Sequence, residues 1–210
     1  MGGAKALLLW RLPDGRELPL AAVHAEQRLA HDSDVVLVVT RERIATLLRP
    51  WLPAGAEILV SAAADHLGPA GSIACAVRWL AEQPWWEPGP TAVAPGAESL
   101  VLITPVDCLP ASAPVAAQLL AALAERPQAN AARPRCGSRR GHPVALRAAA
   151  LGPYGAGLAP PLRDRLRELG DQVIDVDVED SAVLVDVDTP QDAAACGQAP
   201  VRFVPGSALA

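Results

Sequence analysis

Residues 99–110, with the sequence SLVLITPVDCLP, decide the expected fold. The apolar run LVLI at 100–103 is bounded by turn-forming residues, a pattern typical of a strand buried on both faces by covering helices. Asp107 follows just beyond the carboxyl end of this strand, and in open α/β sheets that edge binds ligands. The Asp107 carboxylate could hold a divalent cation against a phosphate, or it could cap a turn or the helix expected after Ser112.

Similar strand signals alternate with helix signals on both sides of this stretch. Strand-like runs occupy residues 35–40, 57–61, 100–103 and 173–178, and apolar residues at helical spacing occupy 41–52, 72–82, 113–125 and 161–169. Strands and helices alternating at this spacing predict βαβ units and a largely parallel sheet. The sequence therefore predicts an α/β fold.

A second acidic segment follows near the end of the chain, at residues 182–192 (AVLVDVDTPQD). It is expected to be another buried strand that ends in carboxylates. Side chains alternate across a strand, so Asp186 and Asp188 would point to the same face. Two carboxylates on one face repel unless a cation or a basic group lies between them. Turn capping by Asp188 would account for one of these acids but not for both.

The most unusual polar segment is RCGSRRGHPVAL at residues 135–146. Its three arginines and His142 lie close together in the sequence, next to Gly137 and Gly141. Guanidinium groups bind phosphate oxygens in a bidentate manner, so this segment suits a phosphate-bearing ligand. A solvated basic loop is the alternative.

Two further candidates precede the Asp107 stretch. Lys5 follows two glycines and could contact phosphates, although an ordinary solvated lysine is the commoner case. Gly68, Gly71 and Ser72 form a Gly/Ser-rich start to a helix, which could offer backbone N–H groups to an anion or a base edge. The alternative is a plain helix cap with Ser72 as the capping residue.

Composition narrows the class of protein. The chain has 210 residues, of which 51% are hydrophobic, and a net charge of −5, which argues against a nucleic-acid footprint. Residues 113–124 come nearest to a membrane span but are too short, and Glu125 follows directly. The N-terminus lacks the zones of a signal peptide. The four scattered cysteines indicate neither a zinc site nor a disulfide framework, and a cytoplasmic protein with reduced cysteines is expected. We expect one domain over residues 1–196 and a C-terminal tail over 197–210.

The order of these segments resembles the MobA-like NTP transferase family, and within it the molybdenum cofactor cytidylyltransferases. The resemblance runs from the first residue to about Ala195 through MGGAKALL, HLGPAGSIACAV, PVDCLP, RGHPVAL, PLRDRLRELG and LVDVDTPQD. RGHP followed by DVDTPQD is fairly specific, whereas PVD alone is not.

The resemblance implies a Rossmann-like, GT-A-like nucleotidyltransferase fold with three layers and a mostly parallel central sheet. It also implies a Mg²⁺-dependent transfer of a nucleoside monophosphate, for this branch CMP from CTP, to the terminal phosphate of a molybdopterin-type cofactor. Pyrophosphate would be released, and the product could pass to molybdoenzymes or their chaperones. No nucleic-acid or membrane partner is expected.

Site residues carry over from the resemblance by position. Lys5 would neutralise the donor phosphates, and Asp107 and Asp188 would hold Mg²⁺ with Asp186 in support. Lys5 and Asp107 would form the catalytic pair. On the ligand side, the turn containing Gly68, Gly71 and Ser72 would border the nucleotide base, and Arg140, Gly141 and His142 would face the acceptor.

The family motif is LAAGxSxRMGxxK, preceded by a strand, and this sequence departs from the motif at the N-terminus. Met1 lies where the motif has its Met, so the first strand, the glycine turn and the arginine of the motif are missing from residues 1–210. Two explanations stand. The true start lies upstream and the protein is longer, or the chain is a degenerate relative that binds a cofactor without catalysis. A sugar-phosphate nucleotidyltransferase is a further alternative, although RGHP favours the molybdenum-cofactor branch.

Overall fold

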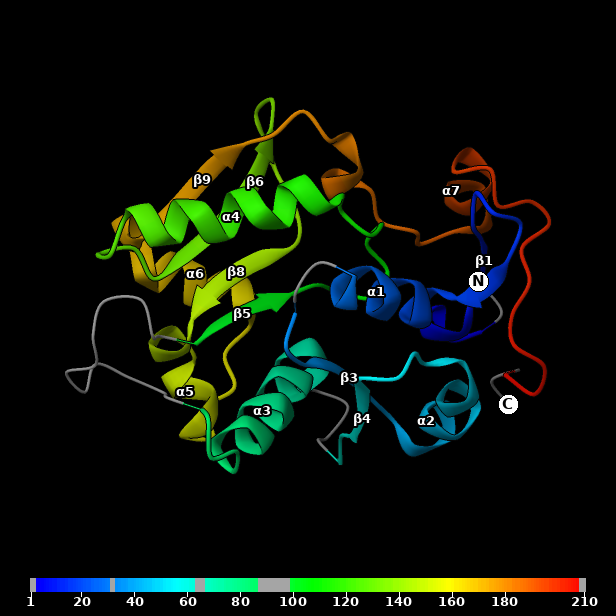
Figure 1. The fold of residues 1–210 in the computed structure, drawn as a ribbon, viewed down its shortest axis with the longest axis horizontal. Coiled ribbons are helices and arrows are strands. Elements are labelled where there is room, and N and C mark those ends of the chain that lie inside the picture. The colour runs from blue at the N-terminus through cyan, green and yellow to red at the C-terminus, as the bar shows by residue number, and fades with distance from the viewer. Residues whose placement is uncertain (1–2, 31–32, 63–66, 87–98, 208–210) are drawn as a thin grey trace. The chain divides into compact units, whose positions relative to one another are not determined.

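The computed structural model describes residues 3–30, 33–62, 67–86 and 99–207 (Figure 1). The chain forms two compact units, each built from segments that are distant in sequence. Unit 1 comprises Met1–Ala62, Val106–Pro110 and Val185–Ala210, and unit 2 comprises Ala63–Pro105 and Ala111–Leu184. The chain therefore crosses between the units on both sides of Asp107 and again before Asp186.

Unit 1 contains two small sheets and the helices that cover them. Its elements are η1 (Lys5–Leu7), β1 (Leu9–Arg11), β2 (Glu17–Pro19), α1 (Leu20–Leu29), β3 (Val36–Thr40), α2 (Glu42–Leu48), η2 (Arg49–Trp51), β4 (Ala56–Val60) and α7 (Pro190–Ala195). β1 and β2 pair in an antiparallel hairpin, and β3 and β4 pair in parallel with Val38 opposite Ile58. The predicted strands at 35–40 and 57–61 and the helix between them are confirmed.

The core of unit 1 forms on both sides of the N-terminal segment. Leu7 packs with Ala21 and Leu48, whereas the adjacent Leu8 packs with Leu20 and Val187. Leu7 and Leu8 are almost completely buried. Burying a leucine side chain contributes about 2 kcal/mol, so this short segment is fixed firmly beside Lys5.

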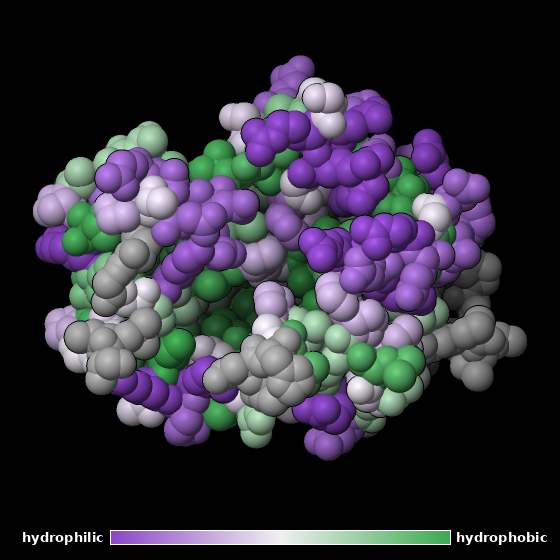
Figure 2. Space-filling model, turned by 180° about the vertical axis from the view of Figure 1, so that it is seen from behind, coloured by the Kyte–Doolittle hydropathy of each residue, from purple (hydrophilic) through white to green (hydrophobic). Residues whose placement is uncertain are grey.

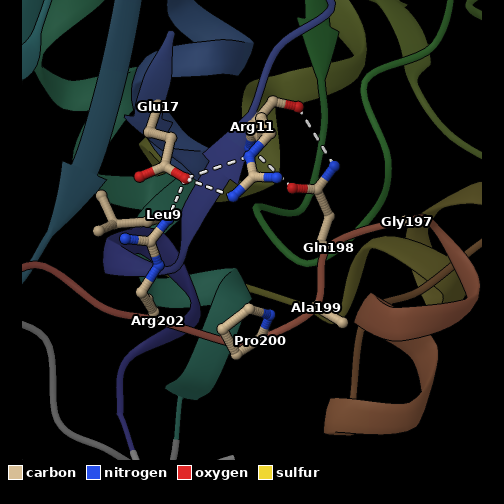
Figure 3. A pocket seen from close by; sticks show the side chains of 8 residues that line it. All are labelled: Leu9, Arg11, Glu17, Gly197, Gln198, Ala199, Pro200 and Arg202. Carbon is tan, nitrogen blue, oxygen red and sulfur yellow. Dashed lines mark hydrogen bonds and ion pairs between the residues drawn. The ribbon is translucent and has the colours of Figure 1, made fainter. Parts of the chain in front are cut away.

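Residues 197–207, in the segment expected as a tail, pack within unit 1. The Leu9 N–H donates to the Arg202 carbonyl at 2.8 Å, and the Val204 N–H donates to the Leu7 carbonyl at 3.0 Å. A small hollow lies beside this pairing (Figure 3). Its polar groups bind one another: the Gln198 amide bonds both the N–H and the carbonyl of Arg11, and Glu17 accepts from Arg11 and Arg202. These hydrogen bonds therefore join the β1–β2 hairpin to the C-terminal segment.

Unit 2 contains a five-stranded sheet with helices around it. Its elements are α3 (Gly68–Ala81), β5 (Leu100–Ile103), α4 (Ala113–Glu125), β6 (Ala131–Cys136), β7 (Arg139–Arg140), β8 (Val144–Arg147), η4 (Ala148–Leu151), α5 (Gly152–Gly155), α6 (Leu162–Leu169), η5 (Gly170–Gln172), β9 (Val173–Asp177) and η6 (Ser181–Leu184). α4 lies across one face of the sheet (Figure 1) and buries Val115, Leu119 and Leu123 against it. The spacing of these residues is the one that predicted this helix.

The sheet of unit 2 corrects the expectation of a mostly parallel sheet. The strand order is β5-β8-β6-β7, with every neighbouring pair antiparallel, and only β9 joins β6 in parallel. The α/β class holds, but the sheet is mixed. The reason is that β8, which follows the RGHP segment, returns between β5 and β6 and runs antiparallel to both.

The face in Figure 2 mixes hydrophobic patches with hydrophilic ones, as is usual for folded proteins. Among the described residues, no helix is both long and apolar enough to cross a membrane.

Candidate active site

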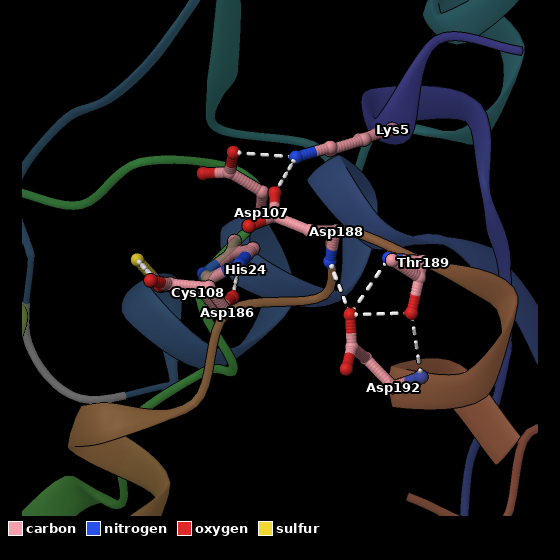
Figure 4. A network of polar contacts seen from close by, with 8 residues as sticks. All are labelled: Lys5, His24, Asp107, Cys108, Asp186, Asp188, Thr189 and Asp192. Atoms are coloured by element: carbon pink, nitrogen blue, oxygen red, sulfur yellow. Dashed lines mark hydrogen bonds and ion pairs between the residues drawn. The ribbon is translucent and has the colours of Figure 1, made fainter. Parts of the chain in front are cut away.

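In unit 1, Lys5 lies between two carboxylates that come from distant parts of the sequence (Figure 4). Its ammonium nitrogen lies 2.9 Å from Asp107 Oδ2 and also donates to Asp188 Oδ1. Lys5 is the only lysine in the 210-residue sequence. The structure therefore brings together three of the residues that the sequence predicts for one site.

The charges of this cluster are partly shielded from water. The side chains of Lys5 and Asp107 are 27% and 35% exposed, whereas that of Asp188 is 64% exposed. Burial lowers the pKa of Lys5, but hydrogen bonds and charge attraction from Asp188 and Asp107 outweigh burial, so the net pKa of Lys5 is raised. The Lys5 side chain is therefore protonated and positively charged at neutral pH.

The start of α7 fixes Asp188. Thr189 and Asp192 form a capping box, in which the Thr189 hydroxyl oxygen accepts from the Asp192 N–H and the Asp192 carboxylate accepts from the Thr189 N–H at 2.7 Å. The same carboxylate accepts from the Asp188 N–H at 3.1 Å. Capping of this kind typically contributes about 1 kcal/mol. The DTPQD motif thus holds the backbone of Asp188 through its own local chemistry.

Backbone pairing joins the Asp107 turn to the segment before Asp188. Val187 N–H donates to the Asp107 carbonyl at 2.7 Å, and Leu109 N–H donates to the Val185 carbonyl at 2.9 Å. Cys108 and Asp186 form a single antiparallel bridge. This arrangement corrects the prediction of a long strand over residues 182–192, where the chain instead forms η6, this bridge and α7.

Two residues for which the sequence predicts no role, His24 and Cys108, make contacts that involve the Asp107 turn. His24 on α1 lies with Nε2 2.9 Å from the Cys108 carbonyl, and the Cys108 thiol donates to Asp186 Oδ1 at 3.1 Å. Burial is the main cause that lowers the pKa of His24 to about 4 and raises the pKa of Cys108. At neutral pH the imidazole is uncharged and the thiol is protonated. In the sequence, the only indications of these contacts are that His24 lies in an apolar helix and that Cys108 directly follows Asp107.

Asp107 and Asp188 have the donor chemistry for Mg²⁺. Their oxygens already converge on one cation, the Lys5 ammonium. Among the described residues no group of three or more histidine, cysteine or acidic side chains is arranged to hold a metal by itself. Mg²⁺ in nucleotide enzymes is typically held by one or two carboxylates together with substrate phosphates. The residues therefore fit a metal that is completed by a bound nucleotide.

The predicted nucleotide-side residues lie in the first turns of α3 in unit 2. The helix begins at Gly68, and Leu67 occupies the capping position without a side-chain hydrogen bond. Ser72 is therefore inside the helix, which corrects its interpretation as the capping residue. Gly71 is buried in the helix, and Gly68 has a φ of +47°, in the left-handed region.

The predicted acceptor-side residues lie at the end of β7, which contains Arg140, and in the segment before β8, which contains Gly141 and His142, in unit 2. Gly141 N–H donates to the Pro134 carbonyl, and His142 N–H donates to the Val183 carbonyl, each at 2.9 Å. A Cβ at position 141 would lie 2.0 Å from the Val183 carbonyl oxygen, so the close approach of these backbones requires glycine. Arg140 is exposed and bonds Asp175, which also accepts from Arg133.

Comparison with known proteins places this geometry in a family. Residues 1–176, most of the chain, match the family described as the MobA-like NTP transferase domain. No curated protein matches the chain. Among solved structures, the crystal structure of a Mycobacterium tuberculosis Rv0371c homolog from Mycobacterium sp. strain JC1 is similar, with a TM-score of 0.65 and 22% identity, over 92% of this chain and 86% of that chain. This likeness confirms the α/β nucleotidyltransferase fold, and the family match shows that the chain belongs to the MobA-like NTP transferase family.

Proposed function

We propose that the protein is a nucleotidyltransferase that transfers CMP from CTP to the terminal phosphate of a molybdopterin-type cofactor. The observation that carries the proposal is the convergence of Lys5, Asp107 and Asp188 in a chain of this family. Nucleotidyl transfer requires neutralised phosphate charge and in-line alignment more than it requires a strong base. One ammonium and two carboxylates at one point supply groups of that kind.

In this proposal Asp107 and Asp188 hold Mg²⁺, and Lys5 neutralises the donor phosphates. Bound Mg²⁺ would supply charge stabilisation on the phosphate oxygens. Lys5 contributes a compact positive charge on a flexible stem, which can move from the carboxylates to a phosphate oxygen. Asp107 and Asp188 start close together because backbone pairing and the α7 cap fix both of them.

On the ligand side, the Gly68–Ser72 turn is proposed to border the base, and Arg140, Gly141 and His142 to face the acceptor. Arg140 is exposed, and its guanidinium carries more donors than its contact with Asp175 uses, which leaves N–H groups for a phosphate. The RGHP sequence favours a molybdopterin-type acceptor over a sugar phosphate.

The test is pyrophosphate release from CTP with molybdopterin and Mg²⁺. We expect release by the wild type, its loss in Asp107→Asn, and unchanged release in Asp171→Asn, which removes an exposed acid of unit 2. Replacing CTP with the other nucleoside triphosphates, and molybdopterin with sugar 1-phosphates, tests the base and the acceptor. Equal release by Asp107→Asn would remove Asp107 from the reaction. Cofactor binding without any release would indicate the non-catalytic binding protein instead.

A further inference from the structure

We infer that His24 and Cys108 are positioning residues: they fix the turn that carries Asp107 against the segment that carries Asp188, so that both carboxylates face one cation. The inference rests on the proposed function only in naming that cation as Mg²⁺. It also gives Asp186 a different part from the metal ligand that the sequence predicts, because Asp186 holds the Cys108 thiol.

The first contact is between Cys108 and Asp186. Cys108 is 2% exposed and directly follows Asp107, and its thiol donates to Asp186 Oδ1 at 3.1 Å. The backbones of the same two residues form the bridge that joins the turn to the second segment. One carboxylate oxygen of Asp186 therefore accepts a hydrogen bond from the turn, whereas Asp188, two residues later, contacts Lys5 (Figure 4).

The second contact is between His24 and the Cys108 backbone. A carbonyl oxygen can only accept, so the His24 Nε2 that lies 2.9 Å from the Cys108 carbonyl carries the hydrogen and donates. His24 belongs to α1, whose residues Ala21, Val23 and Ala25 are buried in unit 1. Because α1 is packed in the core of unit 1, the hydrogen bond from His24 fixes the position of the Cys108 carbonyl relative to this helix.

Together the two contacts hold Cys108 through different atoms. Its carbonyl is bound by His24 and its sulfur by Asp186, while the neighbouring Asp107 carbonyl accepts from Val187 N–H at 2.7 Å. Among the described residues, Lys5 is the only hydrogen-bond partner of the Asp107 side chain, so the direction of this side chain depends on the backbone of the turn. Supporting residues of this type commonly change metal affinity by about tenfold or more.

The test uses two pairs of variants, each with one loss and one rescue. His24→Leu and Cys108→Ala remove the donors, whereas His24→Gln and Cys108→Ser keep one. Cys196→Ala, also in unit 1, is the control for loss of a sulfur. Mn²⁺ is the probe, and its dissociation constant is measured by electron paramagnetic resonance on the full chain without nucleotide and with CTP. We expect about tenfold weaker binding for the two loss variants, near wild-type binding for the rescue variants and no change for Cys196→Ala.

A second readout needs no metal. Hydrogen exchange at the Val187 amide, which donates to Asp107, reports whether the turn stays docked, and the Ser61 amide, bonded to the Thr40 carbonyl at 2.8 Å, is the internal reference. We expect exchange at Val187 to rise by about tenfold in the loss variants while exchange at Ser61 is unchanged.

The outcomes separate the two proposals. If the wild type binds no Mn²⁺ with or without CTP, the metal site of the proposed function fails, and the Val187 exchange still decides the positioning. Wild-type exchange and wild-type Mn²⁺ affinity in the loss variants would overturn the inference. Should His24→Leu not fold, the comparison of Cys108→Ala with Cys108→Ser decides, and equal values for these two would overturn it.

Discussion

Lys5 Nζ lies 2.9 Å from Asp107 Oδ2, although 102 residues separate the two in the sequence. Asp188 contacts the same ammonium and lies 183 positions after Lys5 in the sequence. Three segments of unit 1 thus meet at one cation, and each is fixed by its own local structure: buried leucines beside Lys5, backbone pairing at Asp107 and a helix cap at Asp188. The site is therefore assembled by the fold and does not depend on a single continuous loop.

The shared ammonium predicts the titration of Lys5. Asp188→Asn and Asp107→Asn should each lower the raised pKa of Lys5 toward its usual value, because each removes a hydrogen bond and a charge that raise it. A lysine whose folded pKa is raised stabilises the fold below its unfolded pKa, and this contribution is lost as pH rises through the folded pKa. Since Lys5 is the only lysine, ¹⁵N-lysine labelling gives one Nζ resonance to titrate. Asp171→Asn is the control, and an unchanged pKa in both site variants would contradict the ion cluster.

His24 predicts a loss of stability in mild acid. Its pKa is about 4 in the folded protein against 6.5 for the ordinary group, mainly because burial disfavours the charged ring. The unfolded chain therefore binds a proton that the folded chain rejects, and stability falls as pH drops from about 6.5 toward 4, by roughly 3 kcal/mol in total. Urea unfolding at pH 7.5 and pH 5 measures this. We expect the loss to be smaller in His24→Gln, and identical pH dependence in both proteins would show that His24 does not titrate in this way.

Gly141 predicts a strong steric effect in the RGHP segment. Gly141→Ala would place its Cβ 2.0 Å from a backbone oxygen of Val183, which cannot move without breaking the hydrogen bond from His142. We expect a loss of at least roughly 3 kcal/mol in the free energy of unfolding. Gly152→Ala is the matched control, because a Cβ there meets nothing within 4 Å and the change should be neutral or stabilising by up to about 1 kcal/mol. Equal stability of the two variants in urea would contradict the close approach.

The elements that could be predicted from the sequence are those with strong local periodicity. β3 and β5 are continuous apolar runs, and α4 and α6 carry leucines at helical spacing with proline near their starts. The sequence wrongly predicts a strand over 182–192, because the pairing of this segment is limited to one bridge with the distant Asp107 turn, which leaves no local signal. The return of β8 between β5 and β6 is set by contacts between distant strands, which leave no local signal.

For the candidate site, the sequence predicts which residues carry charge but not how the chain supports them. The sequence predicts Lys5, Asp107 and Asp188 for one site, and in the structure the Lys5 ammonium bonds both carboxylates. The sequence gives no specific signal for His24, because its contact with Cys108 spans 84 residues, and none for the contact of Asp186 with the Cys108 thiol, because a bridge replaces the expected strand. A resemblance in motif order can identify charged positions, whereas supporting contacts depend on packing.

The ion pairs of two neighbouring acids on β9, Asp175 and Asp177, are expected to contribute differently to the free energy of unfolding. Its carboxylate accepts from Arg133 at 2.6 Å and from Arg140 at 3.0 Å, and the side chain is 17% exposed. Burial raises the pKa of Asp175, but the two guanidinium groups outweigh burial and lower it, so its stabilising effect is present at neutral pH and is lost as pH falls through the folded pKa.

Asp175→Asn should therefore lower the free energy of unfolding by about 2 kcal/mol, because an amide offers one acceptor oxygen to two guanidinium groups and no countercharge to the largely buried Arg133. Asp177→Asn is the control: its side chain is 73% exposed beside Arg135, and water screens the pair, so stability should match the wild type. Urea unfolding of the three proteins at pH 7 provides the comparison, and the difference should narrow as the pH is lowered through the folded pKa of Asp175, which lies below its ordinary value. If Asp177→Asn destabilised the protein as much as Asp175→Asn, burial would not be what distinguishes the two ion pairs.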